Sequence, residues 1–174
     1  EIINFKVFMH NIVDNLILIN KEISSINSDT KIIAVSKTFP IEHIQPIIDH
    51  GHLHFGENKV QEAVEKWTDI KSSFEHLKLH MIGKLQTNKV KYVVPLFDYI
   101  HSLDSIKLAE KIFEEQKKNN KNLKIFIQVN IGDENQKSGI DKNNLDVFFK
   151  KCTEDFKLDI IGLMCIPPQN KDVQ

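Results

Sequence analysis

The feature of this sequence that most restricts its fold is a repeated alternation of short apolar runs with longer segments of helical periodicity. Between the runs, apolar residues recur every three or four positions, as on an amphipathic helix. Strict alternation of this kind favours a parallel sheet with helical crossovers, either a doubly wound sheet or a (β/α)8 TIM barrel. The six runs that we predict as strands are residues 31–37, 52–55, 80–83, 97–101, 124–130 and 158–164.

The barrel is the better of the two alternatives. No glycine-rich dinucleotide-binding fingerprint follows the first run, so the usual sign of a Rossmann sheet is missing. Eight βα units typically take about 250 residues, whereas this chain has 174. We predict one barrel domain over residues 1–174 that covers about six βα units, with the last two missing. Because the first and last strands would then be long open edges, we expect the sequence to be part of a longer protein.

Composition excludes several classes of protein. With 23 basic and 24 acidic residues the chain has no basic field of the kind that drives nucleic-acid binding. Its two cysteines, Cys152 and Cys165, are too few for a disulfide framework and fit a reducing compartment. No apolar stretch has the length of a membrane span, and the N-terminal segment lacks a signal-peptide pattern. We predict a cytoplasmic protein with no nucleic-acid or membrane partner.

Lys37 is the most informative single residue, because it ends the first apolar run and lysine is rarely buried without a reason. If its side chain points inward, Ile33 and Val35 share its face and give the amine an apolar floor. Desolvation would then favour the neutral amine, which attacks carbonyl carbons. The alternative is a lysine whose stem is covered while its ammonium group reaches water.

Polar residues follow several of the predicted strands. In a TIM barrel the active site lies at the carboxyl ends of the strands, so we expect these residues to converge on one mouth. Such convergence favours a functional role for Lys37. The residues concerned are Lys37, the turn 54–58, Gly83-Lys84, His101-Ser102, Asn130 and Met164-Cys165.

Seven motifs follow one another along nearly the whole chain. They are Ala34-Val35-Ser36-Lys37-Thr38, His54-Phe55-Gly56-Glu57-Asn58, Ile82-Gly83-Lys84-Leu85-Gln86-Thr87-Asn88-Lys89, His101-Ser102-Leu103-Asp104, Gln128-Val129-Asn130-Ile131, Lys137-Ser138-Gly139 and Gly162-Leu163-Met164-Cys165-Ile166-Pro167. These motifs closely resemble those of the pyridoxal phosphate homeostasis protein family, whose members are single-domain relatives of the alanine racemase barrel (fold type III). Seven ordered motifs are specific, whereas the first alone would be weak.

The resemblance implies that Lys37 forms an internal aldimine with pyridoxal 5′-phosphate (PLP), and that Asn58 lies beside this cofactor. We assign Ser102 and Met164 to the cofactor pocket from their positions at strand ends. The resemblance also implies a carrier that serves intracellular PLP supply, with PLP-dependent apoenzymes as recipients and no amino acid turnover of its own. We expect a monomer or a weak dimer, and we assign no catalytic residue and no metal ligand.

One departure from the family pattern concerns the phosphate group. The family's phosphate-binding Ser, Gly and Thr, and the Arg beside the pyridine nitrogen, lie in a segment after the Pro167-Pro168 loop, which this sequence does not contain. Barrels commonly bind phosphate with the loops after strands seven and eight. We therefore expect the chain as given to hold PLP weakly or not at all.

Two other functions remain open at this point. A fold type III PLP enzyme, such as an amino acid racemase or decarboxylase, shares the barrel but adds a second domain and a catalytic residue from a partner chain. A metal-dependent barrel hydrolase is the other, because His52 and His54 lie two residues apart on one predicted strand, with His80 and His101 on later ones.

Overall fold

A computed structural model of the chain describes residues 2–27, 29–131 and 138–167. Short 3-10 helices at Thr87–Lys89 and Lys142–Asn144 and a π-helical turn at Lys151–Asp155 accompany the main elements. The helices are α1 (Ile2–Ile26), α2 (Ile41–Asp49), α3 (Val60–Ser73), α4 (Val90–Leu96), α5 (Ile106–Asn119) and α6 (Leu145–Lys150). The strands are β1 (Ala34–Val35), β2 (His54–Glu57), β3 (Lys78–Met81), β4 (Tyr99–Leu103), β5 (Lys124–Asn130), β6 (Ile140–Asp141) and β7 (Asp159–Met164).

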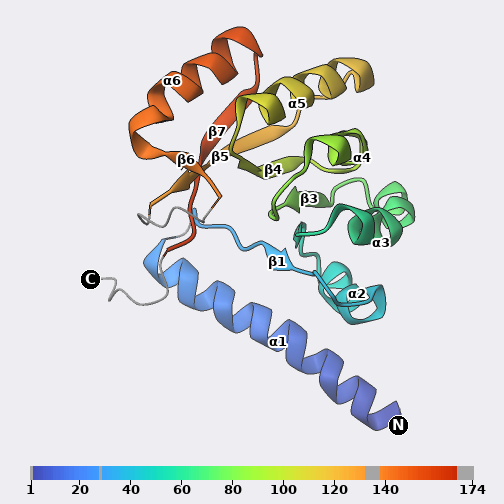
Figure 1. Cartoon of the computed structure of the whole chain (residues 1–174). Coiled ribbons are helices and arrows are strands. Elements are labelled where there is room, and N and C mark those ends of the chain that lie inside the picture. The colour runs from blue at the N-terminus through green and yellow to red at the C-terminus, as the bar shows by residue number, and fades with distance from the viewer. Residues whose placement is uncertain (1, 28, 132–137, 168–174) are drawn as a thin grey trace.

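The strands form one parallel sheet whose spatial order follows the chain order from β1 to β6, with β7 also paired to β5 (Figure 1). In a doubly wound sheet the strand order reverses at a switch point, whereas the wall of a barrel keeps the chain order. The predicted barrel type of α/β fold is therefore confirmed.

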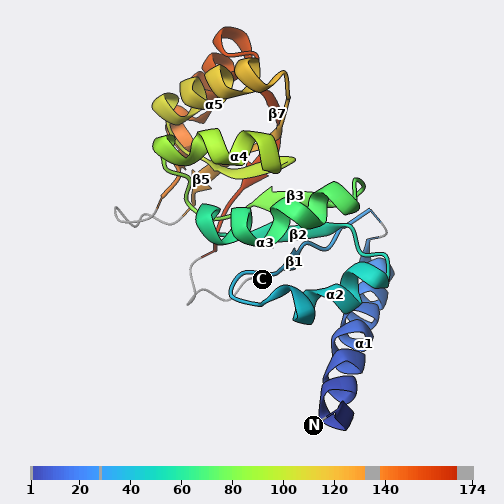
Figure 2. The ribbon, with the colours of Figure 1, turned by 90° about the vertical axis from the view of Figure 1, so that its right-hand side faces the viewer.

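Helices α3, α4 and α5 lie side by side over one face of the sheet (Figure 2). Apolar side chains from alternate strand positions fill the space between the two layers, as the period of two along a strand requires. Phe55 of β2 and Trp67 of α3 are fully buried, with ring centroids 5.0 Å apart. Burying a side chain of this size contributes roughly 2–3 kcal/mol. This layer is the core that fixes the strand ends.

The first predicted strand differs most from the structure. The sequence predicts a strand over residues 31–37 that is covered on both faces, but β1 contains only Ala34–Val35, and Val35 is 46% exposed. The reason is that β1 pairs only with β2 among the described strands, so one of its edges and part of its surface stay open. Glu57 lies outside the predicted strand 52–55, but in the structure it is the buried last residue of β2.

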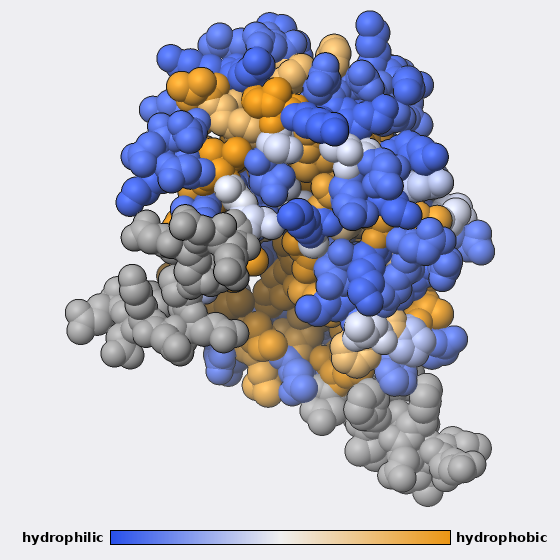
Figure 3. Space-filling model, in the orientation of Figure 1, coloured by the Kyte–Doolittle hydropathy of each residue, from blue (hydrophilic) through white to orange (hydrophobic). Residues whose placement is uncertain are grey.

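Three strands of the described part of the sheet have a single partner, since β1 pairs only with β2, and β6 and β7 each pair only with β5. Leu163 of β7 is 57% exposed. Apolar residues are also visible in the hollow at the centre of the face shown in Figure 3. Within the described residues, no helix has the length and apolar character needed to cross a bilayer.

Candidate functional site

Lys37 lies in the turn that follows β1. The amide of Phe39 donates to the carbonyl of Ser36 at 3.2 Å, which closes the turn, and Thr38 has a φ of 66°. The side chain of Lys37 is exposed to solvent. The end of a two-residue edge strand does not enclose the amine, so the condition for an apolar floor of Ile33 and Val35, a side chain that points inward, is not met. The accessible amine matches the alternative in which its charge reaches water.

Asn58 follows β2 and is packed against the end of β3. A Cβ atom at Gly83 would lie 2.2 Å from the carbonyl oxygen of Asn58, so only glycine allows the two loops to approach this closely. The side-chain oxygen Oδ1 of Asn58 is buried and has no hydrogen-bond partner among the described residues. Buried polar atoms nearly always have partners, so this oxygen is a candidate ligand atom.

Ser102 is part of β4 and is 2% exposed. Its hydroxyl oxygen likewise finds no partner in the described part of the chain. Asn58 and Ser102, both predicted as site residues, thus present unsatisfied polar atoms at or near the carboxyl ends of two strands. Both oxygens are candidate partners for a polar ligand at the mouth of the sheet.

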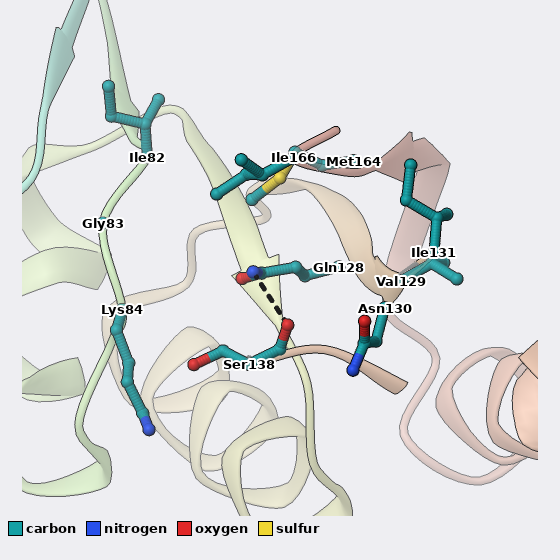
Figure 4. A pocket seen from close by; sticks show the side chains of 10 residues that line it. All are labelled: Ile82, Gly83, Lys84, Gln128, Val129, Asn130, Ile131, Ser138, Met164 and Ile166. Atoms are coloured by element: carbon teal, nitrogen blue, oxygen red, sulfur yellow. Dashed lines mark hydrogen bonds between the residues drawn. The ribbon is translucent and has the colours of Figure 1, made fainter. Parts of the chain in front are cut away.

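Met164 lines a cavity of about 290 Å³ at the carboxyl ends of β3, β5 and β7 (Figure 4). The polar members of this cavity include Lys84 and Gln128, and Nε2 of Gln128 donates to the carbonyl oxygen of Ser138 at 3.2 Å. Lys37, Asn58 and Ser102 are not among its lining residues. The structure therefore joins three of the predicted strand ends in one cavity and leaves Lys37 on the β1 side of the mouth.

Gln128 and Ser138 are residues to which sequence reasoning gave no role. Both belong to motifs that resemble the family, but neither ends a predicted strand with a reactive group. Their shared hydrogen bond connects β5 to the segment before β6, and Gly139 makes this approach possible with a φ of 129°. The signal for them was the glycine after Ser138, which marks a close backbone contact.

Three histidines form a hydrogen-bonded chain across neighbouring strands. Nδ1 of His54 lies 2.9 Å from Nε2 of His80, and Nδ1 of His80 lies 2.8 Å from Nε2 of His101. Since Phe55 faces α3, the adjacent His54 lies on the opposite face of the sheet. Burial lowers the pKa of His80 to about 3 and that of His101 to about 4, so both rings are neutral at pH 7.

These histidines do not support the metal hydrolase alternative. Their ring nitrogens bind one another, and Nε2 of His52 donates to the carbonyl of His54 at 2.9 Å. In the described ranges, no group of three or more His, Cys, Asp and Glu side chains is arranged to hold a metal ion.

The chain is similar to known proteins over almost its entire length. The alanine racemase N-terminal domain family matches residues 9–174. The pyridoxal phosphate homeostasis protein of Haemophilus influenzae is 38% identical over 170 residues, which are 94% of this chain and 72% of the relative. That of Pasteurella multocida is 40% identical over 146 residues. The match covers 84% of this chain and 63% of the Pasteurella protein's length.

Solved structures agree with this similarity. PipY of Synechococcus elongatus, determined with PLP bound, has a TM-score of 0.76 and 33% identity, covering 88% of this chain and 73% of PipY. Alanine racemase from E. faecalis has a TM-score of 0.59 at 13% identity, which shows a shared fold alone.

Proposed function

This chain belongs to the pyridoxal phosphate homeostasis protein family, and from that premise we propose that it binds PLP at the carboxyl ends of its strands. The observation that carries the proposal is the pair of buried, unpartnered oxygens, Oδ1 of Asn58 and Oγ of Ser102, that the described part of the chain leaves at the mouth of the sheet. The PLP-bound structure of PipY, a relative with the same fold, supports it.

Lys37 is the proposed covalent anchor. Its exposed amine is accessible to an aldehyde from solvent, and condensation of the two groups forms an imine and releases one water molecule. Asn58 and Ser102 would bind polar groups of PLP, and Met164 would form an apolar wall beside the ring. We propose that two further βα units of a longer protein bind the phosphate group, so that the chain as given retains PLP weakly.

The proposed role is storage and supply of a reactive aldehyde in the cytoplasm, with PLP-dependent apoenzymes as recipients and no amino acid turnover. A reversible imine keeps the aldehyde from modifying other lysines and releases it on exchange with another amine. The protein would act as a single barrel domain, as a monomer or a weak dimer. The free cysteines are compatible with a reducing compartment, since Cys152 is buried and Cys165 is exposed without a disulfide.

The decisive experiment compares Lys37→Ala with Lys84→Ala. Lys84 is the matched control, because it is a second exposed lysine at the mouth and lines the cavity next to Met164. Each variant is incubated with PLP, its absorption spectrum is recorded, and the imine is reduced with borohydride before peptide mass spectrometry. We expect the imine band and the reduced adduct in the wild type and in Lys84→Ala, and neither in Lys37→Ala.

An adduct that persists in Lys37→Ala and disappears in Lys84→Ala would move the anchor to Lys84. Amino acid racemisation or decarboxylation at enzymatic rates, lost in Lys37→Ala, would instead establish a fold type III enzyme.

A further inference from the structure

The residues before and after Lys37, Ser36 and Thr38, form hydrogen bonds with side chains of β2 and α3. We propose that Glu57, Glu62 and Lys66 are positioning residues, which fix the backbone around Lys37 so that its amine points toward the mouth of the sheet. This inference rests on the proposed role of Lys37 as the anchor. It adds residues that act through Lys37 and do not touch the cofactor themselves.

The residue before Lys37 is held by a buried charged pair. Nζ of Lys66 donates to the carbonyl oxygen of Ser36 at 2.7 Å and to Oε1 of Glu57 at 2.9 Å. The hydroxyl of Ser36 donates to the same Glu57 oxygen at 2.7 Å. Ser36 is thus fixed through both its side chain and its backbone, which leaves the next residue little freedom.

The residue after Lys37 is held by the same helix. The amide of Thr38 donates to Oε1 of Glu62 at 2.7 Å. Thr38 adopts a φ of 66°, which is a rare conformation for a β-branched residue and costs roughly 1–2 kcal/mol. Glu62 and Lys66 are four residues apart and so share one face of α3. Strain of this kind persists where the surroundings enforce it, commonly at functional sites.

The burial of the Glu57–Lys66 ion pair indicates that it fixes the position of the Lys37 turn more than it stabilises the fold. The side chain of Glu57 is fully buried and that of Lys66 is 9% exposed. The attraction within a buried ion pair offsets little more than the free energy needed to remove both charges from water. Its clearest effect is therefore to fix the arrangement of the groups that it binds. The indole Nε1 of Trp67 also donates to Oε1 of Glu57 at 3.0 Å. Trp67 is the chain's single tryptophan and therefore reports directly on the pair.

The main test is Lys66→Met, which keeps the apolar stem and removes the ammonium group. Lys71→Met is its matched control. Lys71 lies on the same helix and is also largely buried. Its Nζ likewise donates hydrogen bonds to a backbone carbonyl, that of Leu96, and to the carboxylate of Asp98. Both variants therefore lose the same kind of interaction from α3, and only Lys66→Met disturbs the turn at Lys37.

Two readouts at Lys37 separate positioning from general destabilisation. The first is the equilibrium constant for imine formation with PLP, and the second is the pH dependence of Lys37 acetylation by trace acetic anhydride, which needs no cofactor. We expect Lys66→Met to lower the imine constant roughly tenfold and to alter the acetylation profile of Lys37. Lys71→Met should change the imine constant by less than about twofold. Partial recovery is expected in Lys66→Arg.

A second variant keeps the proposal testable if Lys66→Met does not fold. Glu62→Ala removes the acceptor of the Thr38 amide, and Glu65→Ala is its control, because Glu65 is exposed on α3 and bonds only Gln61 among the described residues. Folded variants, verified by the fluorescence of Trp67, that show wild-type imine constants and wild-type Lys37 acetylation would overturn the inference. A change in Lys37 acetylation without any imine in the wild type would support positioning and reject the proposed function.

Discussion

Nδ1 of His80 and Nε2 of His101 lie 2.8 Å apart, and both residues are buried on the face of the sheet opposite α3. A neutral imidazole has one donor and one acceptor nitrogen, so this contact holds only while at least one ring is uncharged. Protonation of both rings would break this hydrogen bond, so the stability of the sheet depends on pH.

We predict that the protein loses stability as the pH falls below about 6.5. Burial lowers the pKa of His80 to about 3 and that of His101 to about 4, whereas the unfolded chain takes up protons near 6.5. The unfolded state thus binds more protons in this range, and each histidine removes about 1.4 kcal/mol of the free energy of unfolding per pH unit. Urea unfolding at pH 7 and pH 5 measures the slope. His80→Gln should reduce it, and His50→Gln, at an exposed position, should not.

We predict that Ser102→Ala raises stability slightly and weakens PLP binding. The hydroxyl oxygen of Ser102 is buried without a partner in the described ranges, so its removal costs no hydrogen bond in the free protein. Ser105→Ala is the contrast, because Ser105 caps α5 by accepting from the amide of Leu108, and its loss should cost about 1 kcal/mol. Urea midpoints and equilibrium dialysis with PLP check the pair. Unchanged PLP binding in Ser102→Ala would remove this serine from the site.

We predict that Gly83→Ala is among the most harmful single changes at the mouth. The new Cβ would lie 2.2 Å from a backbone oxygen of Asn58, so the loop after β2 must move, at a cost of roughly 3 kcal/mol. Gly56→Ala should cost about 1 kcal/mol, because its Cβ meets side-chain atoms of Ile33 and Ile82 at 3.0 Å and 3.2 Å, which can shift. Thermal unfolding ranks the two, and equal costs would contradict the close approach at Asn58.

We predict that Thr38→Gly leaves stability unchanged or raises it by up to about 1 kcal/mol, because relief of the left-handed strain outweighs the added freedom of the unfolded chain. Imine formation at Lys37 should nevertheless weaken, since the turn becomes less rigid. Asn120→Gly is a suitable comparison. Asn120 ends α5 with a φ of 48°, which asparagine tolerates, so less strain is available for release. A clear loss of stability in Thr38→Gly would show that the turn is not strained.

The predicted strand bounds agree best with the structure at the C-terminal end of the chain. β5 spans Lys124–Asn130 as predicted, and β7 spans Asp159–Met164 where residues 158–164 were predicted. β2, β3 and β4 are each displaced by two residues from the predicted ranges, because an apolar run does not mark the residues that pair with the next strand. β1 is shorter than the run 31–37, since hydrophobicity does not reveal that a strand has only one neighbour. β6, at Ile140–Asp141, is too short for any periodicity to indicate.

The candidate site residues could be named from the sequence, but the contacts that support them could not. Motif resemblance and the strand-end rule gave Lys37, Asn58, Ser102 and Met164 as candidates, and Met164 lines the cavity. The burial of Glu57 could not be predicted, because a buried carboxylate is stable only with donors from elsewhere in the chain. Its donors come from Ser36, Lys66 and Trp67, and no local pattern connects Ser36 to the other two.

The contacts that fix the Lys37 turn have a consequence for the order in which the site can form. Ser36 is separated from Glu57 by 21 positions and from Lys66 by 30, and Thr38 from Glu62 by 24. All of them lie within the first two strands and α3, so the proposed anchor and its support are synthesised before β3 to β7. Contacts this close in sequence close small loops and form early. The turn that carries Lys37, the proposed anchor, can therefore form before the strands that complete the cavity around Met164.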